Sequence, residues 1–211
     1  MDTFDLETFL LESTIVEECP DEDDLCLDPD FRTAWRGEIA AIQRAGDRLE
    51  RLAARLEVEA SALALEESSG RYTASYESER IGLWPSEAAF LADLGIVPVL
   101  DAYCSGWERL EDDQQGAVVA GLRVFLEACP ECDGAITARE EVRDTCCTEI
   151  TQARLECAEC HAVLVTSSTN RCWQPPEPRL VVHSDTIPGV RTAFEPVWEA
   201  NVHDCNCLSV G

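Results

Sequence analysis

Two Cys-x-x-Cys pairs with the same spacing constrain this chain more than any other feature of its sequence. Cys129 and Cys132 form the first pair, Cys157 and Cys160 form the second, and 24 residues separate the pairs. Each pair can direct two sulfurs at one ion, and the segment between them is long enough for a β-hairpin that brings the pairs together. The pattern predicts a zinc ribbon, in which four thiolates hold one Zn²⁺. A rubredoxin-like iron site is the alternative that the spacing leaves open.

The chain is also strongly acidic. Its 211 residues include 42 Asp and Glu but only 16 basic residues, all of them arginine, which gives a formal net charge of −26. The acidic residues are spread along the chain and are not collected in one tail. This composition favours a halophilic protein, because molar salt shrinks the Debye length to about 3 Å and weakens self-repulsion. A mesophilic acidic protein is the alternative.

Hydropathy and cysteine usage predict the compartment. No segment approaches the roughly 18 consecutive apolar residues of a membrane helix, and the acidic residues 1–11 lack the features of a signal peptide. We therefore expect a cytoplasmic protein without a membrane partner. A reducing cytoplasm favours metal ligation and buried thiols over disulfides, and Cys19, Cys26 and Cys104 are expected to be thiols without an assigned partner.

Composition and periodicity divide the chain into four parts. Residues 1–30 are expected to form an acidic, mobile arm. Residues 31–128 are expected to form a mostly helical domain with a small β-hairpin. Residues 129–168 follow as the zinc ribbon, and residues 169–211 form an irregular tail that contains Cys and His. The predicted fold class is α+β.

Apolar spacing indicates the elements of the helical domain. Between residues 31 and 56 apolar side chains recur at three- and four-residue steps, which predicts one long helix or two helices broken near Gly46. Alternation also predicts a strand over residues 61–65 and, after a turn at Gly70 and Arg71, a hairpin within residues 72–84.

Capping residues indicate two further helices. Ser86 is the expected N-cap of a helix that stops at Gly95, before a linker that contains Pro98. Another helix is expected over residues 112–128, where it leads directly into the first cysteine pair.

Two further cysteines and one histidine lie close to the predicted metal site. Cys146 and Cys147 fall near the tip of the ribbon hairpin and are interpreted as packed thiols, with extra ligands or a redox pair as alternatives. His161 gives the second pair the Cys-x-x-Cys-His spacing of haem attachment. The missing export signal and the matching first pair argue against haem.

The C-terminal part has the ligand types for a second metal or redox site. A surface or buried thiol pair is the favoured interpretation, because the Cys-x-Cys spacing is less diagnostic than Cys-x-x-Cys. The candidate residues are Cys172, His203, Cys205 and Cys207.

The sequence contains no familiar catalytic motif, such as a phosphate-binding glycine loop, Gly-x-Ser-x-Gly or His-Glu-x-x-His. Four arginines have the spacing of one helix face, which could follow a phosphate backbone. They are Arg44, Arg48, Arg51 and Arg55. A salt-bridged solvent face is the favoured alternative, because Asp47 lies four residues before Arg51.

Four motifs carry a resemblance to a known group of proteins. They are Trp84-Pro-Ser-Glu-Ala-Ala89, Phe125-Leu-Glu-Ala-Cys129-Pro-Glu-Cys132, Cys146-Cys147 and Cys157-Ala-Glu-Cys160. By these motifs residues 31–166 resemble a group of haloarchaeal zinc-ribbon proteins of unknown function. The resemblance implies an α+β N-terminal part with an appended ribbon and no established activity. It also implies that Asp133 and His161 occupy positions usually held by glycine.

These observations lead to one main hypothesis about function and two alternatives. The main hypothesis is a non-enzymatic protein in which a structural zinc site supports a surface for a protein or nucleic-acid partner. The first alternative is a thiol redox or metal-handling protein that uses Cys146 and Cys147 or Cys205 and Cys207. The second is a DNA-binding regulator that uses the face from Arg44 to Arg55.

Overall fold

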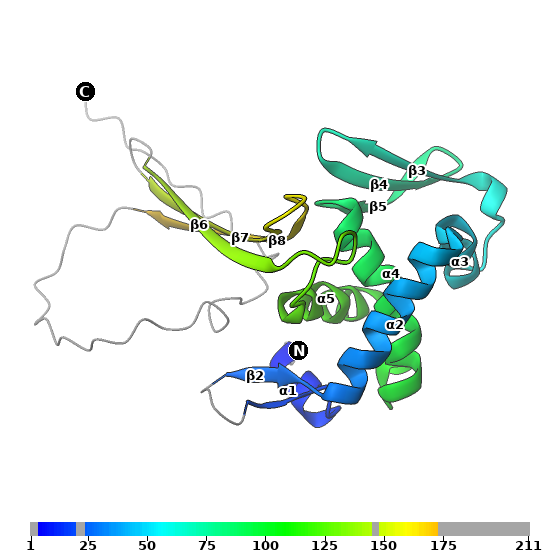
Figure 1. The fold of residues 1–211 in the computed structure, drawn as a ribbon, viewed down its shortest axis with the longest axis horizontal. Helices are drawn as coiled ribbons and strands as arrows, with labels where there is room; N and C mark the ends of the chain where they lie inside the picture. The colour runs from blue at the N-terminus through cyan, green and yellow to red at the C-terminus, as the bar shows by residue number, and fades with distance from the viewer. Residues whose placement is uncertain (1–3, 20–23, 145–147, 173–211) are drawn as a thin grey trace, which may run out of the picture.

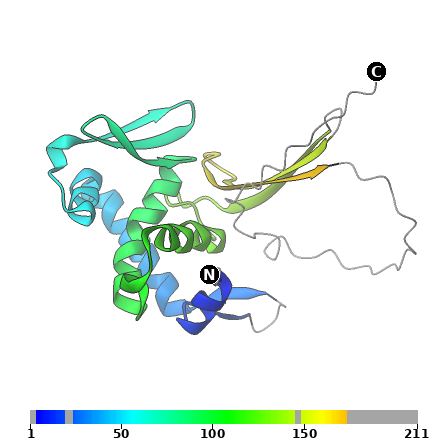
Figure 2. The same cartoon turned by 180° about the vertical axis from the view of Figure 1, so that it is seen from behind.

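The computed structural model describes residues 4–19, 24–144 and 148–172. These residues form five α-helices and three antiparallel sheets, so the predicted α+β class is confirmed. The helices and the two smaller sheets make up a part that we call the helical body, and the third sheet extends away from it (Figure 1). The opposite view shows the same arrangement (Figure 2). Among the described residues no helix is long and apolar enough to cross a membrane.

Residues 1–30 were expected to form a mobile arm, but the part of them that the structure describes contains a helix and two strands. It forms α1 (Leu6–Glu12) and a hairpin of β1 (Val16–Glu18) and β2 (Leu25–Leu27). Leu10 and Ile15 are buried in the main hydrophobic core. Enough apolar side chains alternate with the acids to fix this segment on the body.

A disulfide closes the β1–β2 hairpin. The sequence assigns no partner to Cys19 or Cys26, but the structure joins them, with their Cα atoms 5.3 Å apart. The antiparallel register explains the pairing, because it places Cys26 opposite Glu17, close to the end of β1. Cys104 is buried and carries a free thiol.

The second and third helices are α2 (Pro29–Ala45) and α3 (Arg48–Leu56). Of the two possibilities that the sequence leaves open, one long helix or two helices broken near Gly46, the structure has the second. This glycine has φ 68°, in the left-handed region that glycine adopts without a Cβ clash. The Asp28 carboxylate accepts the Phe31 N–H at 2.9 Å and caps the start of α2.

The fourth helix, α4 (Glu87–Tyr103), begins at the predicted N-cap Ser86 but runs past Gly95 and Pro98. The predicted end at Gly95 is wrong, because this glycine serves packing between helices. A Cβ at position 95 would lie 2.9 Å from Cγ1 of Ile39 in α2. The glycine therefore allows α2 and α4 to cross closely, and this crossing lies at the centre of the body (Figure 1).

A three-stranded sheet covers α3 and α4. Its strands are β3 (Leu63–Ser68), β4 (Arg71–Tyr76) and β5 (Glu79–Trp84), in the order β3-β4-β5. β3 overlaps the strand predicted over residues 61–65, and β4 and β5 form the hairpin predicted within residues 72–84. Tyr72 of β4 packs on Phe90 of α4, with ring centroids 5.0 Å apart, so the sheet and the helices share a small second core.

The fifth helix, α5 (Asp112–Leu122), ends before the predicted end at residue 128. A single 3-10 turn over Arg123–Phe125 follows, and the chain is extended from Leu126. The helix ends where the Arg123 side chain pairs with Asp93 of α4.

The third sheet contains β6 (Ile136–Asp144), β7 (Thr148–Cys157) and β8 (Val163–Cys172), in the order β6-β7-β8. β6 and β7 form the hairpin predicted between the two cysteine pairs. The register pairs Ile136 with Cys157, so the end of the sheet nearest the body carries the cysteines.

Candidate metal centre

Four cysteine sulfurs meet where the third sheet joins the body. The Sγ atoms of Cys129, Cys132, Cys157 and Cys160 all lie within 4.8 Å of one another. Cys129 Sγ lies 3.7 Å from Cys160 Sγ, and Cys132 Sγ lies 3.5 Å from Cys157 Sγ. Sulfurs at about 2.3 Å from a tetrahedral ion are about 3.8 Å apart. The four side chains are therefore placed to bind one metal ion.

Each Cys-x-x-Cys pair forms a tight turn, which we call the first knuckle (residues 129–134) and the second knuckle (residues 157–162). The Asp133 N–H donates to the Cys129 carbonyl at 3.0 Å, and the His161 N–H donates to the Cys157 carbonyl at 3.1 Å. Asp133 and His161 have φ of 58° and 61°. This left-handed backbone explains why glycine suits both positions.

Replacing Asp133 and His161 by glycine should stabilise the protein. A left-handed residue with a Cβ costs about 1 kcal/mol, and the greater freedom of glycine in the unfolded chain offsets part of the gain. We expect the double variant Asp133→Gly/His161→Gly to gain about 1 kcal/mol in denaturant unfolding of the metal-loaded protein. Ala158→Gly, at a knuckle position without positive φ, should lose stability. A double variant less stable than the natural protein would contradict the prediction.

Gly134 is a residue of the site that the sequence analysis missed. A Cβ at this position would lie 2.8 Å from Cys157 Sγ and 2.6 Å from Cγ of Glu159. The second knuckle therefore packs directly on the backbone of the first. The Ala158 N–H also donates to the Ala135 carbonyl at 2.9 Å, which joins the knuckles. The sequence signal for this contact is a glycine two residues after Cys132.

The four sulfurs differ in burial and in their electrostatic surroundings. Cys129 and Cys157 are buried, whereas Cys132 and Cys160 are exposed. Burial raises the pKa of the Cys129 thiol, and the N–H groups of Glu131 and Cys132 oppose this effect. Burial also opposes ionisation of Cys157, but backbone N–H groups of the second knuckle, together with the thiols of Cys132 and Cys160, outweigh it and lower the pKa of this thiol to about 7. These N–H groups favour the thiolate that a metal ion requires.

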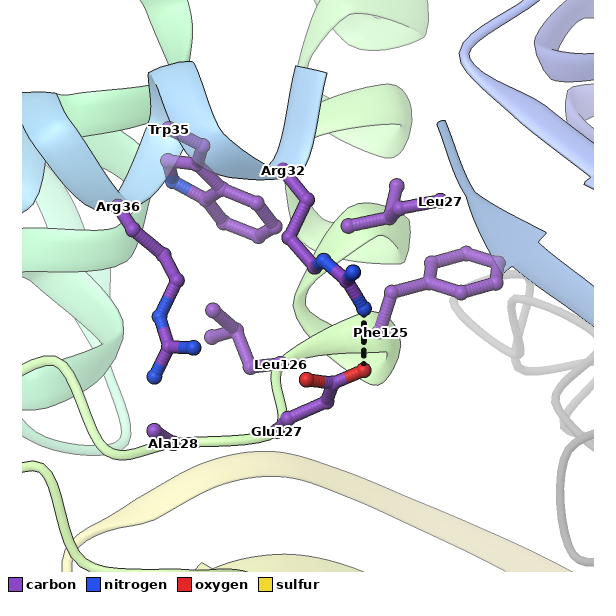
Figure 3. A pocket seen from close by; sticks show the side chains of 8 residues that line it. All are labelled: Leu27, Arg32, Trp35, Arg36, Phe125, Leu126, Glu127 and Ala128. Atoms are coloured by element: carbon purple, nitrogen blue, oxygen red, sulfur yellow. Dashed lines mark hydrogen bonds and ion pairs between the residues drawn. The ribbon is translucent and has the colours of Figure 1, made fainter. Parts of the chain in front are cut away.

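Helix α2 holds the first knuckle and the segment that leads into it. Gln43 Nε2 donates to the carbonyls of Pro130 and Glu131 at 2.6 and 3.1 Å. Arg32 pairs with Glu127 at 2.8 Å. Figure 3 shows this pair crossing a crevice between α2 and residues 125–128. The first knuckle is therefore fixed to the helical body.

Strand β8 is held to the body by two polar contacts. Ser86 Oγ donates to the Val163 carbonyl at 2.7 Å, and Arg123 Nη1 donates to the Leu164 carbonyl at 3.1 Å. Arg123 also makes two hydrogen bonds to Asp93, at 2.6 and 2.8 Å. Cys129, Cys157 and Leu164 belong to the same buried cluster as the helices. The sulfur site is thus continuous with the main core.

The four arginines predicted to share a helix face lie on two helices. Arg44 is near the end of α2, and the other three belong to α3. Arg48 pairs with Glu87, Arg51 pairs with Asp47 and Glu38, and Arg55 donates to Gln115. Most of these guanidinium groups thus have partners within the chain.

The predicted second metal or redox site falls almost entirely outside the part of the chain that the structure describes. Cys172 is the last residue of β8. Cys146, Cys147, His203, Cys205 and Cys207 lie outside the described residues.

Two family models match the chain. Family of unknown function (DUF8054) central domain matches residues 5–124, and Family of unknown function (DUF8054) C-terminal domain matches residues 127–167. The first match covers α1 to α5, and the second contains all four clustered cysteines. No curated protein and no solved structure matches the chain.

Proposed function

Because the chain belongs to DUF8054, a family of unknown function, we propose a function from its own residues: a non-enzymatic protein with a zinc ribbon as its C-terminal domain. Cys129, Cys132, Cys157 and Cys160 would hold one structural Zn²⁺. The convergence of their sulfurs within 4.8 Å carries this proposal. Four thiolates leave a tetrahedral ion no open position, which suits a structural role rather than catalysis. Zinc is preferred over iron because four-thiolate structural sites most often hold zinc.

We propose a protein as the partner, with the third sheet as the surface that it contacts. The sheet extends from the body (Figure 1), and Val142 on its edge strand β6 is 54% exposed. The charges of the sheet are of both signs and pair with one another, as in Arg139 with Glu156 and Arg154 with Glu141. A nucleic acid would favour unpaired basic side chains, and the arginines of α3 are also engaged within the chain.

Affinity purification from the native host at native salt tests both parts of this proposal. We expect about one zinc per chain by elemental analysis, and a protein that co-purifies with the natural chain but is reduced severalfold with Val142→Asp. Iron with visible absorption, or a folded metal-free protein, would overturn the zinc ribbon. A partner retained equally by both chains would exclude this edge of the sheet, and recovery of nucleic acid alone would exclude a protein partner.

A further inference from the structure

A side chain of the helical body donates hydrogen bonds to the turn of one knuckle, and the described residues show no such donor to the other. Gln43 of α2 donates to both carbonyls within the first Cys-x-x-Cys turn, those of Pro130 and Glu131. The corresponding carbonyls of the second turn belong to Ala158 and Glu159. Among the residues that the structure describes, no side chain of the body donates to these two. The two halves of the sulfur site therefore differ in their support.

The carbonyls that Gln43 holds belong to the peptide units that face the buried sulfur. A trans peptide unit is planar, and its C=O and N–H groups point in opposite directions. In the unit between Pro130 and Glu131, the carbonyl accepts from Gln43 and the N–H donates to Cys129 Sγ at 3.4 Å. The next unit repeats the pattern, since the Glu131 carbonyl accepts from Gln43 and the Cys132 N–H points to the same sulfur.

We propose that Gln43 is a positioning residue of the metal centre, which fixes both peptide planes so that their N–H groups point at Cys129 Sγ. This inference rests on the proposed zinc site. N–H groups aimed at a thiolate stabilise its charge, and a carbonyl that accepts a hydrogen bond makes the N–H of its unit a better donor. Through this contact the central domain contributes to the metal affinity of the C-terminal domain.

The expected size of the effect follows from the exposure of Gln43. Groups that orient metal ligands typically change metal affinity by about 10- to 100-fold. Because Gln43 is exposed to solvent, water competes for its hydrogen bonds, and we expect the lower end of this range, about tenfold.

The test compares three variants of the full chain. Gln43→Met removes the N–H donor but keeps a long side chain with a similar helix propensity. Arg44→Met is the matched control, since Arg44 is the exposed neighbour on α2 and makes no hydrogen bond or ion pair to the knuckle among the described residues. Gln43→Lys restores an N–H donor on a flexible side chain. Zinc affinity is measured by competition with a chromophoric chelator, and the sulfur-to-metal charge-transfer band is measured on the Co²⁺-loaded protein.

We expect Gln43→Met to bind zinc about tenfold more weakly and to shift the Co²⁺ band. Arg44→Met should match the natural protein, and Gln43→Lys should recover most of the affinity. An unchanged affinity and band in Gln43→Met, or an equal loss in Arg44→Met, would overturn this inference alone. A natural protein that binds neither ion would overturn the proposed zinc site together with it.

Discussion

Replacing Cys157 by serine is expected to abolish metal binding and to unfold the C-terminal domain. The Cys157 sulfur is fully buried, where β7 enters the second knuckle. In small zinc domains the metal contributes on the order of 10 kcal/mol to folding, and this domain adds few residues of its own to the buried cluster. Elemental analysis should find no zinc in Cys157→Ser, and amide hydrogen exchange should show loss of protection in β6, β7 and β8.

Cys104→Ser is the matched control for this experiment. Cys104 is equally a buried free thiol, but it lies at the end of α4 and outside the sulfur cluster. The control variant should keep about one zinc per chain. The proposed ligand set fails if Cys157→Ser retains its zinc, or if both variants lose zinc to the same extent.

The second large effect is expected at the ion pair that joins α4 to β8. Arg123→Met should lower the free energy of unfolding by about 3 kcal/mol, because it leaves Asp93, whose side chain is only 15% exposed, without its cation. Among the residues that the structure describes, the Trp84 Nε1–H, which donates to Asp93 at 2.7 Å, is then its one remaining partner. The variant also loses the bond to the Leu164 carbonyl that holds β8. Urea unfolding in molar KCl measures the loss, since the acidic chain is expected to need screening.

Two further variants and a pH series separate this ion pair from a general loss of charge. The double variant Asp93→Leu/Arg123→Met should recover much of the stability, because no buried charge remains unpaired. Arg154→Met removes an exposed ion pair and should cost less than about 1 kcal/mol.

Burial raises the pKa of Asp93. Between the pKa of an unfolded aspartate and the raised pKa, folded Arg123→Met therefore holds a proton that the unfolded chain has released, and its stability should fall as pH rises through this range. A flat pH profile would contradict this account.

Local signals were enough to predict the sulfur cluster and several element boundaries. The two cysteine pairs lie within single turns, so their spacing alone indicates that four sulfurs can converge. Ser86 caps a helix, and Gly46 breaks one, through contacts within a few residues. In each case the residues that make the contact are the same neighbouring residues from which the prediction was made.

The features that were missed depend on contacts between distant segments. Gly95 looks like a helix end, but its role is set by Ile39 of another helix. Gln43 supports the first knuckle through hydrogen bonds to Pro130 and Glu131, which lie 87 and 88 positions further along the chain. The disulfide of Cys19 and Cys26 is the exception, because it spans only seven positions; it was missed because the acidic composition concealed the hairpin whose register pairs the two residues.

The disulfide has a practical consequence for the handling of this protein. One chain contains an oxidised cysteine pair and four cysteines that are placed to bind a metal ion, which requires their reduced form. Dithiothreitol in a storage buffer would keep the four cysteines reduced but would also cleave the disulfide. Leu27, in the disulfide-closed hairpin, lines the same crevice as Glu127, just before the first knuckle (Figure 3). Purification with zinc present and without added thiol should therefore preserve both the disulfide and the four-cysteine cluster.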